Sequence, residues 1–135
     1  HREKVLSAMG FGDNTKDLSV NGKVEDQSDE TELLGAEATS FRAIAARLNY
    51  LSQDSPDIQF AAKEVCREMA KPKISSWRKL KMLARFVLGR EKIVWKYNWL
   101  EGDVSLDVFT DSDWAGCRRT RRSTSGGAVM LGGTV

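Results

Sequence analysis

Two aspartates and four arginines stand close together in the stretch 108–122, which reads VFTDSDWAGCRRTRR. An apolar run ends at the two aspartates, and the arginines follow a Gly turn: Asp111 and Asp113, then Arg118, Arg119, Arg121 and Arg122. Carboxylate oxygens at a strand end suit a hard divalent ion such as Mg²⁺. Arginine forks bind phosphate oxygens, often bidentately. A site that handles a nucleic-acid backbone uses both groups, so the stretch predicts chemistry at a phosphodiester.

Simpler interpretations of these residues stay open at this point. Asp111 and Asp113 are also what an ordinary solvated strand end carries, and Arg118 to Arg122 could form a solvated basic loop or a nuclear-localisation-like run. Arg78, Lys81 and Arg85 share one stripe of a predicted helix, and most such stripes are simply the wet side of a helix. The four tryptophans suggest base stacking, although core packing is expected for at least two of them.

Composition limits the classes of protein that fit. A chain of 135 residues with 41% hydrophobic residues can build one ordinary domain. It has no apolar run long enough to span a bilayer and no signal-peptide pattern, so we expect a soluble, intracellular protein. Its two cysteines cannot form a disulfide framework, and its single histidine, His1, argues against histidine acid–base catalysis.

Charge divides the chain into an acidic and a basic part. Residues 1–39 hold four Lys or Arg against nine Asp or Glu, whereas residues 40–135 hold 17 against 10. We predict that 1–39 is an acidic N-terminal segment with a short helix in 1–12 and a linker or loop from 13 to 37. The chain opens with His1 and closes inside an apolar run, which suggests a piece of a longer protein.

Helical periodicity dominates residues 40–89, the second predicted segment. Apolar residues recur at helical spacing from Phe41 to Leu51, then from Ile58 to Met69, and again from Trp77 to Leu88. Ser55 and Pro56 mark a helix start by capping and by the fixed backbone of proline, and Gly89 marks a stop. The pattern predicts three helices packed as a small subdomain.

Strand-forming residues replace the helical pattern in the third predicted segment, 90–135. The predicted strands are 92–100, 104–110 and 126–133, with 104–110 and 126–131 paired antiparallel. Asp111 then falls where a strand ends. The predicted class is α+β, with three helices followed by antiparallel strands.

The string FTDSDWAG followed by RRSTSGG resembles the start of the ribonuclease H region in Pol polyproteins of copia-type LTR retrotransposons. FRAIAARLNYLSQDSPDIQFAAKEVCREMAKP, at 41–72, resembles the helical segment that precedes it, and WRKLKMLARFVLGR resembles the next helix. More loosely, REKVLSAMGFGDNTKDLSV is similar to the stretch after the polymerase palm. The resemblance therefore covers nearly the whole chain, with 108–127 its most specific part.

The resemblance implies a reverse transcriptase and ribonuclease H parent that acts on RNA–DNA hybrids with Mg²⁺. It makes Asp111 the catalytic metal ligand and the four arginines nucleic-acid contacts. The strands would open a truncated ribonuclease H-like sheet, and 40–89 would connect polymerase to ribonuclease H. The expected partners are nucleic acid and the rest of the polyprotein, without a membrane, in the cytoplasm or the nucleus.

The chain on its own is expected to be inactive. Its sequence has no adjacent Asp-Asp pair of the kind that holds a polymerase metal, and the further ribonuclease H carboxylates would lie beyond Val135. Two other hypotheses remain: a non-catalytic nucleic-acid-binding remnant of a degenerate element, and a helical protein-interaction module.

Overall fold

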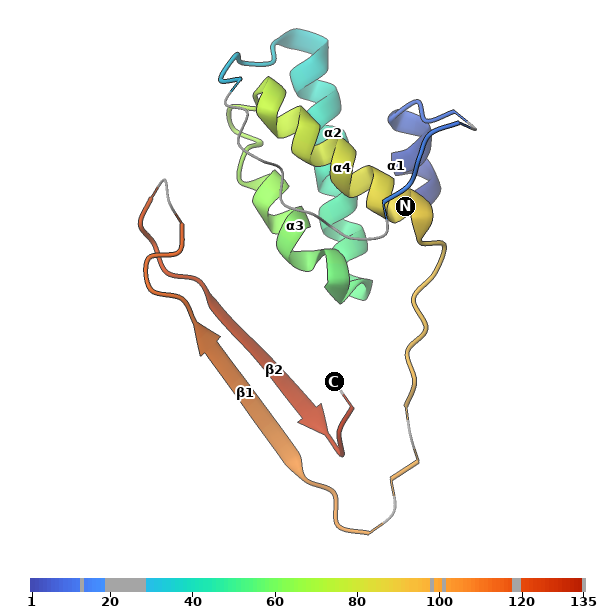
Figure 1. Ribbon diagram of the computed structural model, residues 1–135, viewed down its shortest axis with the longest axis vertical. Helices are drawn as coiled ribbons and strands as arrows, with labels where there is room; N and C mark the ends of the chain where they lie inside the picture. The colour runs from blue at the N-terminus through green and yellow to red at the C-terminus, as the bar shows by residue number, and fades with distance from the viewer. Residues whose placement is uncertain (13, 19–28, 98, 101, 118–119, 135) are drawn as a thin grey trace. The chain divides into compact units, whose positions relative to one another are not determined.

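The computed structural model describes residues 1–12, 14–18, 29–97, 99–100, 102–117 and 120–134. The chain forms two compact units, one from His1 to Ile93 and one from Val94 onward. The first unit holds the helices and the second holds the strands (Figure 1). The predicted α+β content is therefore confirmed.

The helices of the first unit, in chain order, are α1 (Arg2–Ala8), α2 (Gly35–Leu51), the single 3₁₀ turn η1 (Ser52–Asp54), α3 (Pro56–Cys66) and α4 (Ile74–Gly89). The three helices predicted within 40–89 are confirmed as α2, α3 and α4. The predicted start of α2 near Ser40 is wrong, because the helix begins at Gly35. Leu34 is the N-cap residue, and its side chain has no oxygen that could accept a capping hydrogen bond, so the sequence carries no start signal there. Ala36 and Ala38 have a high helix propensity and extend the helix toward Leu34.

Apolar side chains from four helices form one core in this unit. The buried members are Val5, Phe41, Ile44, Ala45, Leu48, Ile58, Ala62, Val65, Leu80, Leu83, Ala84 and Val87. They sit at the helical spacing seen in the sequence, which confirms the predicted apolar faces. Pro56 occupies the first turn of α3 as predicted, but Ser55 makes no side-chain cap and only its backbone carbonyl accepts, from the Ile58 N–H.

Arg2 ties the start of the chain to the C-terminal end of α4. Its Nε donates to the carbonyls of Val87 and Arg90, each at 3.1 Å, and its Nη2 donates to that of Leu88 at 2.9 Å. The last carbonyls of a helix have no partner within the helix, and they lie at its negative end. A guanidinium therefore suits this position through both its hydrogen bonds and its charge.

The N-terminal end of α4 is held by residues 29–33. The N–H groups of Ile74 and Ser75 donate to the carbonyls of Thr31 and Asp29, at 3.0 and 3.3 Å. Glu30 pairs with Lys73, and Asp29 lies 3.9 Å from the Arg78 guanidinium. Hydrogen bonds from Thr31 are the main reason why the pKa of Asp29 is lowered. Within the predicted linker 13–37, residues 29–33 are therefore held against the start of α4. Residues 13 and 19–28 lie outside the described residues.

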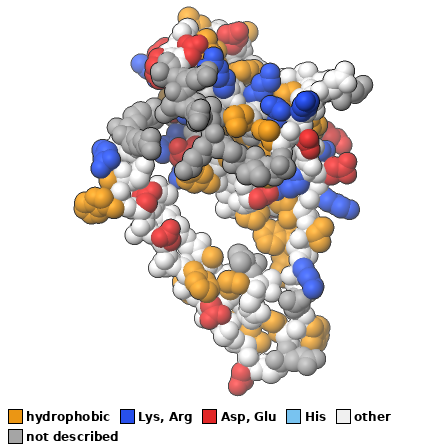
Figure 2. All heavy atoms as spheres, in the orientation of Figure 1, with side chains coloured by type: hydrophobic (Ala, Val, Ile, Leu, Met, Phe, Trp, Pro, Cys, Tyr) orange, Lys and Arg blue, Asp and Glu red, His pale blue; other side chains and the backbone are white. Residues whose placement is uncertain are grey.

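The strands of the second unit are β1 (Leu106–Ser112) and β2 (Ser125–Leu131), paired antiparallel as predicted. Leu106 lies opposite Leu131, Val108 opposite Val129 and Asp111 opposite Gly126. Because side chains alternate along a strand, the four apolar residues of the first two pairs share one face. All four are more than half exposed, and Figure 2 shows hydrophobic side chains at the surface of this strand pair.

The predicted strand 92–100 is wrong. Residues 92–97, 99 and 100 lie in neither helix nor strand, and Figure 1 draws no strand arrow over them. Valine, tyrosine and tryptophan favour strands because they fit a pleated, half-buried surface, and that preference takes effect only when another strand supplies the surface.

Candidate nucleic-acid interface

Asp111 lies at the end of β1, next to the last residue of the strand. Its cross-strand neighbour is Gly126, and even an added Cβ at Gly126 would meet open space. The Asp111 side chain is exposed. The predicted position of Asp111 at a strand end is therefore confirmed, and its carboxylate is open to a ligand from solvent.

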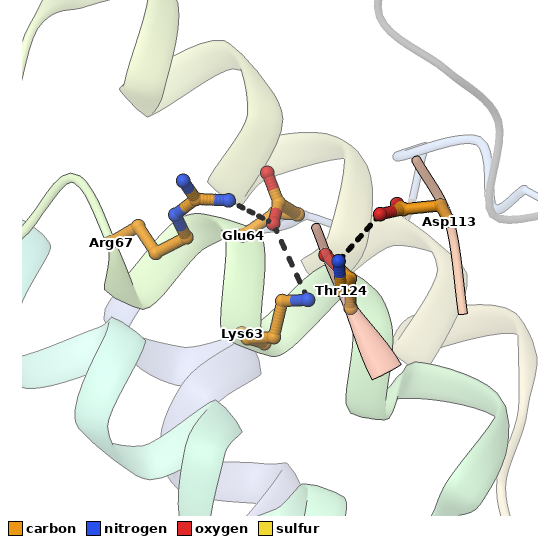
Figure 3. Close-up of polar contacts among 5 residues, drawn as sticks. All are labelled: Lys63, Glu64, Arg67, Asp113 and Thr124. Atoms are coloured by element: carbon orange, nitrogen blue, oxygen red, sulfur yellow. Dashed lines mark hydrogen bonds and ion pairs between the residues drawn. The ribbon is translucent and has the colours of Figure 1, made fainter. Parts of the chain in front are cut away.

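Asp113 closes the connection between the strands instead of joining Asp111 in a site. Its Oδ1 accepts a hydrogen bond from the Thr124 N–H at 2.5 Å (Figure 3), while its own N–H donates to the Thr124 carbonyl at 3.0 Å. A Cβ added at Gly116 would lie 2.1 Å from Asp113 Oδ2. Asp113 therefore fixes the loop, and the absence of a side chain at Gly116 makes room for it.

We call residues 117–122 the basic loop, and backbone hydrogen bonds of Cys117 hold its described part together. The Arg121 N–H donates to the Cys117 carbonyl at 2.7 Å, and the Cys117 N–H donates to the Arg122 carbonyl at 3.2 Å. Arg121 has a left-handed backbone with φ of 54°. The side chains of Arg121 and Arg122 are exposed, as the nucleic-acid prediction requires. Arg118 and Arg119, the other two predicted contacts, lie outside the described residues.

Metal binding needs more carboxylates than this region supplies. Among the described residues, no three Asp, Glu, His or Cys side chains gather closely enough to hold a metal ion. The Asp113 carboxylate is already engaged by Thr124. Asp111 could contribute one oxygen ligand to Mg²⁺, but two-metal hydrolysis needs several. The described residues therefore do not fit a complete Mg²⁺ site.

Several basic side chains on or next to α3 and α4 have local partners. Glu64 lies 3.0 Å from the Arg67 guanidinium and 3.8 Å from the Lys63 ammonium (Figure 3). On the predicted basic stripe of α4, Arg85 Nε donates to the Lys16 carbonyl at 2.6 Å, and Arg78 faces Asp29. Two of the three basic residues of the α4 stripe, Arg78 and Arg85, are therefore partly satisfied within the helical unit.

The tryptophans divide differently from the prediction that at least two would pack in a core. Trp77 alone packs against the helical core, with its ring 6.3 Å from that of Phe41. Trp95, Trp99 and Trp114 are exposed by 44%, 88% and 92%. The expectation that at least two would pack in a core is therefore wrong, because only Trp77 does so, and a two-stranded sheet offers little surface to bury the other three.

No described helix is long and apolar enough to cross a membrane. Comparison with known proteins gives relatives from Arabidopsis thaliana. The chain is 33% identical over 134 residues to the uncharacterized mitochondrial protein AtMg00810 of Arabidopsis thaliana, and the match covers 98% of this chain and 54% of that protein. It is also 33% identical, over 97 residues, to the retrovirus-related Pol polyproteins of the Arabidopsis transposons RE2 and RE1.

Those two matches cover 70% of this chain but only 6% of each polyprotein. The chain thus spans about half the length of the mitochondrial relative and a small part of the polyproteins. No protein-family model matches the chain, and no solved structure matches it.

Proposed function

We propose, from the premise that this chain belongs to the retrotransposon Pol polyproteins, that it corresponds to the segment between polymerase and ribonuclease H in a copia-type element. Membership itself rests on the RE1 and RE2 relatives, which confirm the predicted resemblance to retrotransposon Pol polyproteins. The helical unit would be the connection, and β1 and β2 would be opening strands of a ribonuclease H-like sheet. The parent would act on RNA–DNA hybrids during DNA synthesis and RNA cleavage.

The observation that carries this proposal is the placement of opposite charges on the β1–β2 hairpin. The exposed carboxylate of Asp111 lies next to the last residue of β1, and the loop that leads to β2 carries the exposed Arg121 and Arg122. Opposite charges on the two parts of one turn suit complementary tasks at a nucleic-acid backbone. The arginines would hold phosphates, and each neutralised phosphate would add a salt-dependent increment to affinity.

In the intact parent, Asp111 would be one of several carboxylates that bind Mg²⁺. The ions would supply an activated water and would stabilise the leaving oxygen. The contribution of this chain is the position of Asp111, fixed by the strand pairing opposite Gly126. Since the described residues supply no complete metal site, we expect the chain alone to bind hybrids without cleaving them.

The test is a titration of a fluorescently labelled RNA–DNA hybrid at two salt concentrations. Changing Arg118, Arg119, Arg121 and Arg122 to alanine should weaken binding and flatten its salt dependence, because fewer counterions are released. The matched control changes four lysines of the helical unit to alanine: Lys4, Lys71, Lys79 and Lys81. This control removes the same charge from another surface and should change binding and its salt slope less.

Asp111→Asn separates binding from chemistry. In this chain it should leave hybrid binding equal or slightly tighter, since it removes a negative charge close to phosphate. In the full polyprotein the same change should abolish RNA cleavage. Equal weakening by the arginine and lysine sets would show that binding depends only on net charge. It would contradict the proposal that the basic loop binds the hybrid's phosphates.

A further inference from the structure

A short acidic segment lies against the most basic helix of the first unit. Residues 29–33, which read DETEL, hold three carboxylates and no Lys or Arg. From Met69 to Arg90, by contrast, the sequence holds seven Lys or Arg and no Asp or Glu, and α4 occupies most of this stretch. We call residues 29–33 the acidic strap. The proposed roles of Asp111 and the basic loop do not involve it.

We propose that the acidic strap is an autoinhibitory contact, which keeps Lys73 and Arg78 from binding the phosphates of a nucleic acid. This role rests on the proposed function for the class of ligand, and it adds a second surface whose use the chain itself limits. Carboxylates and phosphates compete for the same ammonium and guanidinium groups. A strap that neutralises these cations therefore lowers the affinity of the chain for a polyanion.

The backbone of the strap fixes where it lies. The Leu33 N–H donates to the Pro72 carbonyl at 2.8 Å, and Glu32 and Lys73 form an antiparallel bridge. The Leu33 side chain also packs against the helical core. The strap therefore runs in a defined register beside the residues that lead into α4.

Two carboxylates of the strap reach the cations. Glu30 pairs with the Lys73 ammonium, and Asp29 Oδ2 lies 3.9 Å from Arg78 Nη2. The other oxygen of Asp29, Oδ1, accepts a hydrogen bond from the Thr31 N–H at 3.2 Å, which orients the carboxylate. The strap thus places one carboxylate beside each of the two cations, where a phosphate would otherwise bind.

These ion pairs are open to competition from a polyanion. The side chain of Glu30 is 66% exposed, and that of Arg78 is 45% exposed. Salt bridges between exposed side chains contribute little stability, because water solvates both ions. A nucleic acid presents a row of phosphates and releases counterions when it binds, so it can displace two carboxylates. The strap should therefore weaken binding without abolishing it.

The experiment titrates the labelled RNA–DNA hybrid with the full chain and with a neutral-strap variant, Asp29→Asn/Glu30→Gln/Glu32→Gln. These substitutions remove the charges and keep the backbone bonds of the strap. The affinity of the variant for the hybrid should rise at least about fivefold at low salt, because two cations become available to phosphates.

The matched control removes three exposed carboxylates elsewhere in the helical unit: Glu3→Gln/Asp54→Asn/Glu91→Gln. It changes the net charge by the same amount. It should tighten hybrid binding less than about twofold, because solvent and salt screen charges that lie away from the contact.

A second variant tests the cations directly. Lys73→Gln/Arg78→Gln should change the hybrid affinity of the parent by less than about twofold, because the strap already engages both side chains. In the neutral-strap background the same two substitutions should reverse the gain in affinity. A purely structural contact would not produce this dependence on the background.

Two results would overturn the autoinhibitory role. One is a neutral-strap variant that binds the hybrid no more tightly than its matched control. The other is an equal loss of affinity from Lys73→Gln/Arg78→Gln in both backgrounds. Unchanged helical circular dichroism should show that each variant keeps the helical unit folded. Neither result would touch the assignment of the basic loop, which is tested with the arginine variants.

Discussion

At the scale of single residues, Asp111 and Asp113 stand two positions apart but differ in their surroundings. Asp113 accepts from the Thr124 N–H, so Asp113→Ala should loosen the loop by removing that acceptor. The loss should be about 1 kcal/mol, as for a typical hydrogen bond, because the pair is exposed. Hydrogen exchange at the Thr124 amide should speed up.

Asp113→Asn is the control for this prediction, because its side-chain oxygen can still accept. It should keep most of the Thr124 amide protection. Asp111→Asn should leave that amide unchanged. Equal exchange rates in the Asp113→Ala variant and the parent would contradict the structural role of Asp113.

Burial raises the pKa of the Cys66 thiol, whose Sγ donates to the Ala45 carbonyl at 3.6 Å. The folded state therefore prefers the neutral thiol. Stability from this group is fully present below the unfolded thiol pKa, which is 9.0, and it falls as pH rises through the higher folded value. Urea unfolding between pH 7 and 10.5 should show a steeper loss for the parent than for Cys66→Ala. Parallel curves would contradict the assignment.

The sequence could place Asp111, but it could not settle what Asp113 does. A strand pattern that ends at Thr110 puts Asp111 at the strand end, whatever the partner strand is. The bond from Thr124 to Asp113 depends on how the chain returns eleven residues later, and no local pattern encodes that return. For the same reason, the exposure of Trp114 could not be foreseen.

At the scale of elements, the C-terminal end of α4 depends on Arg2. Arg2→Ala would leave the carbonyls of Val87, Leu88 and Arg90 without this donor, and it would remove a cation from the negative helix end. We expect a loss of about 1.5–3 kcal/mol in the free energy of unfolding, the range for hydrogen bonds to charged groups. Urea unfolding followed by circular dichroism measures it.

Lys4→Ala removes the same charge from an exposed position on the same helix, so it serves as the control for Arg2→Ala. It should change the free energy of unfolding by less than about 0.5 kcal/mol, as expected for a surface substitution. Similar losses in both variants would mean that net charge, not the bonds to α4, carries the effect.

The helices could be predicted where their apolar faces repeat, because burial of one face is what stabilises each helix. The contacts that position them could not. Arg2 meets a segment more than eighty residues later, and Asp29 and Thr31 meet the start of α4 more than forty residues later. The strand predicted at 92–100 failed for the related reason that propensity does not specify a partner.

At the scale of the whole molecule, the hairpin is the weaker of the two units. Leu106, Val108, Val129 and Leu131 form an apolar face that is more than half exposed, and both strands have an edge that pairs with no other described strand. A two-stranded sheet of this kind is marginal in water and invites association. The isolated chain should therefore aggregate as its concentration rises.

Val108→Lys combined with Val129→Lys should reduce this aggregation, because it places charges at the centre of the apolar face. Light scattering over a concentration series is the measurement. Phe60→Lys is the control, since Phe60 is an exposed apolar residue on α3. If the control suppresses aggregation equally, the hairpin face is not its source.

The bonds from Arg2 to the end of α4 also determine how the helical unit can be joined to other sequences. They bring the first residues of this unit beside its last helix, as Figure 1 shows. A module whose chain enters and leaves at neighbouring points can be inserted into a host protein without forcing the host's flanking segments apart. The helical unit thus has the geometry of an insertable cassette, and lengthening or exchanging what precedes and follows it should leave its core unchanged.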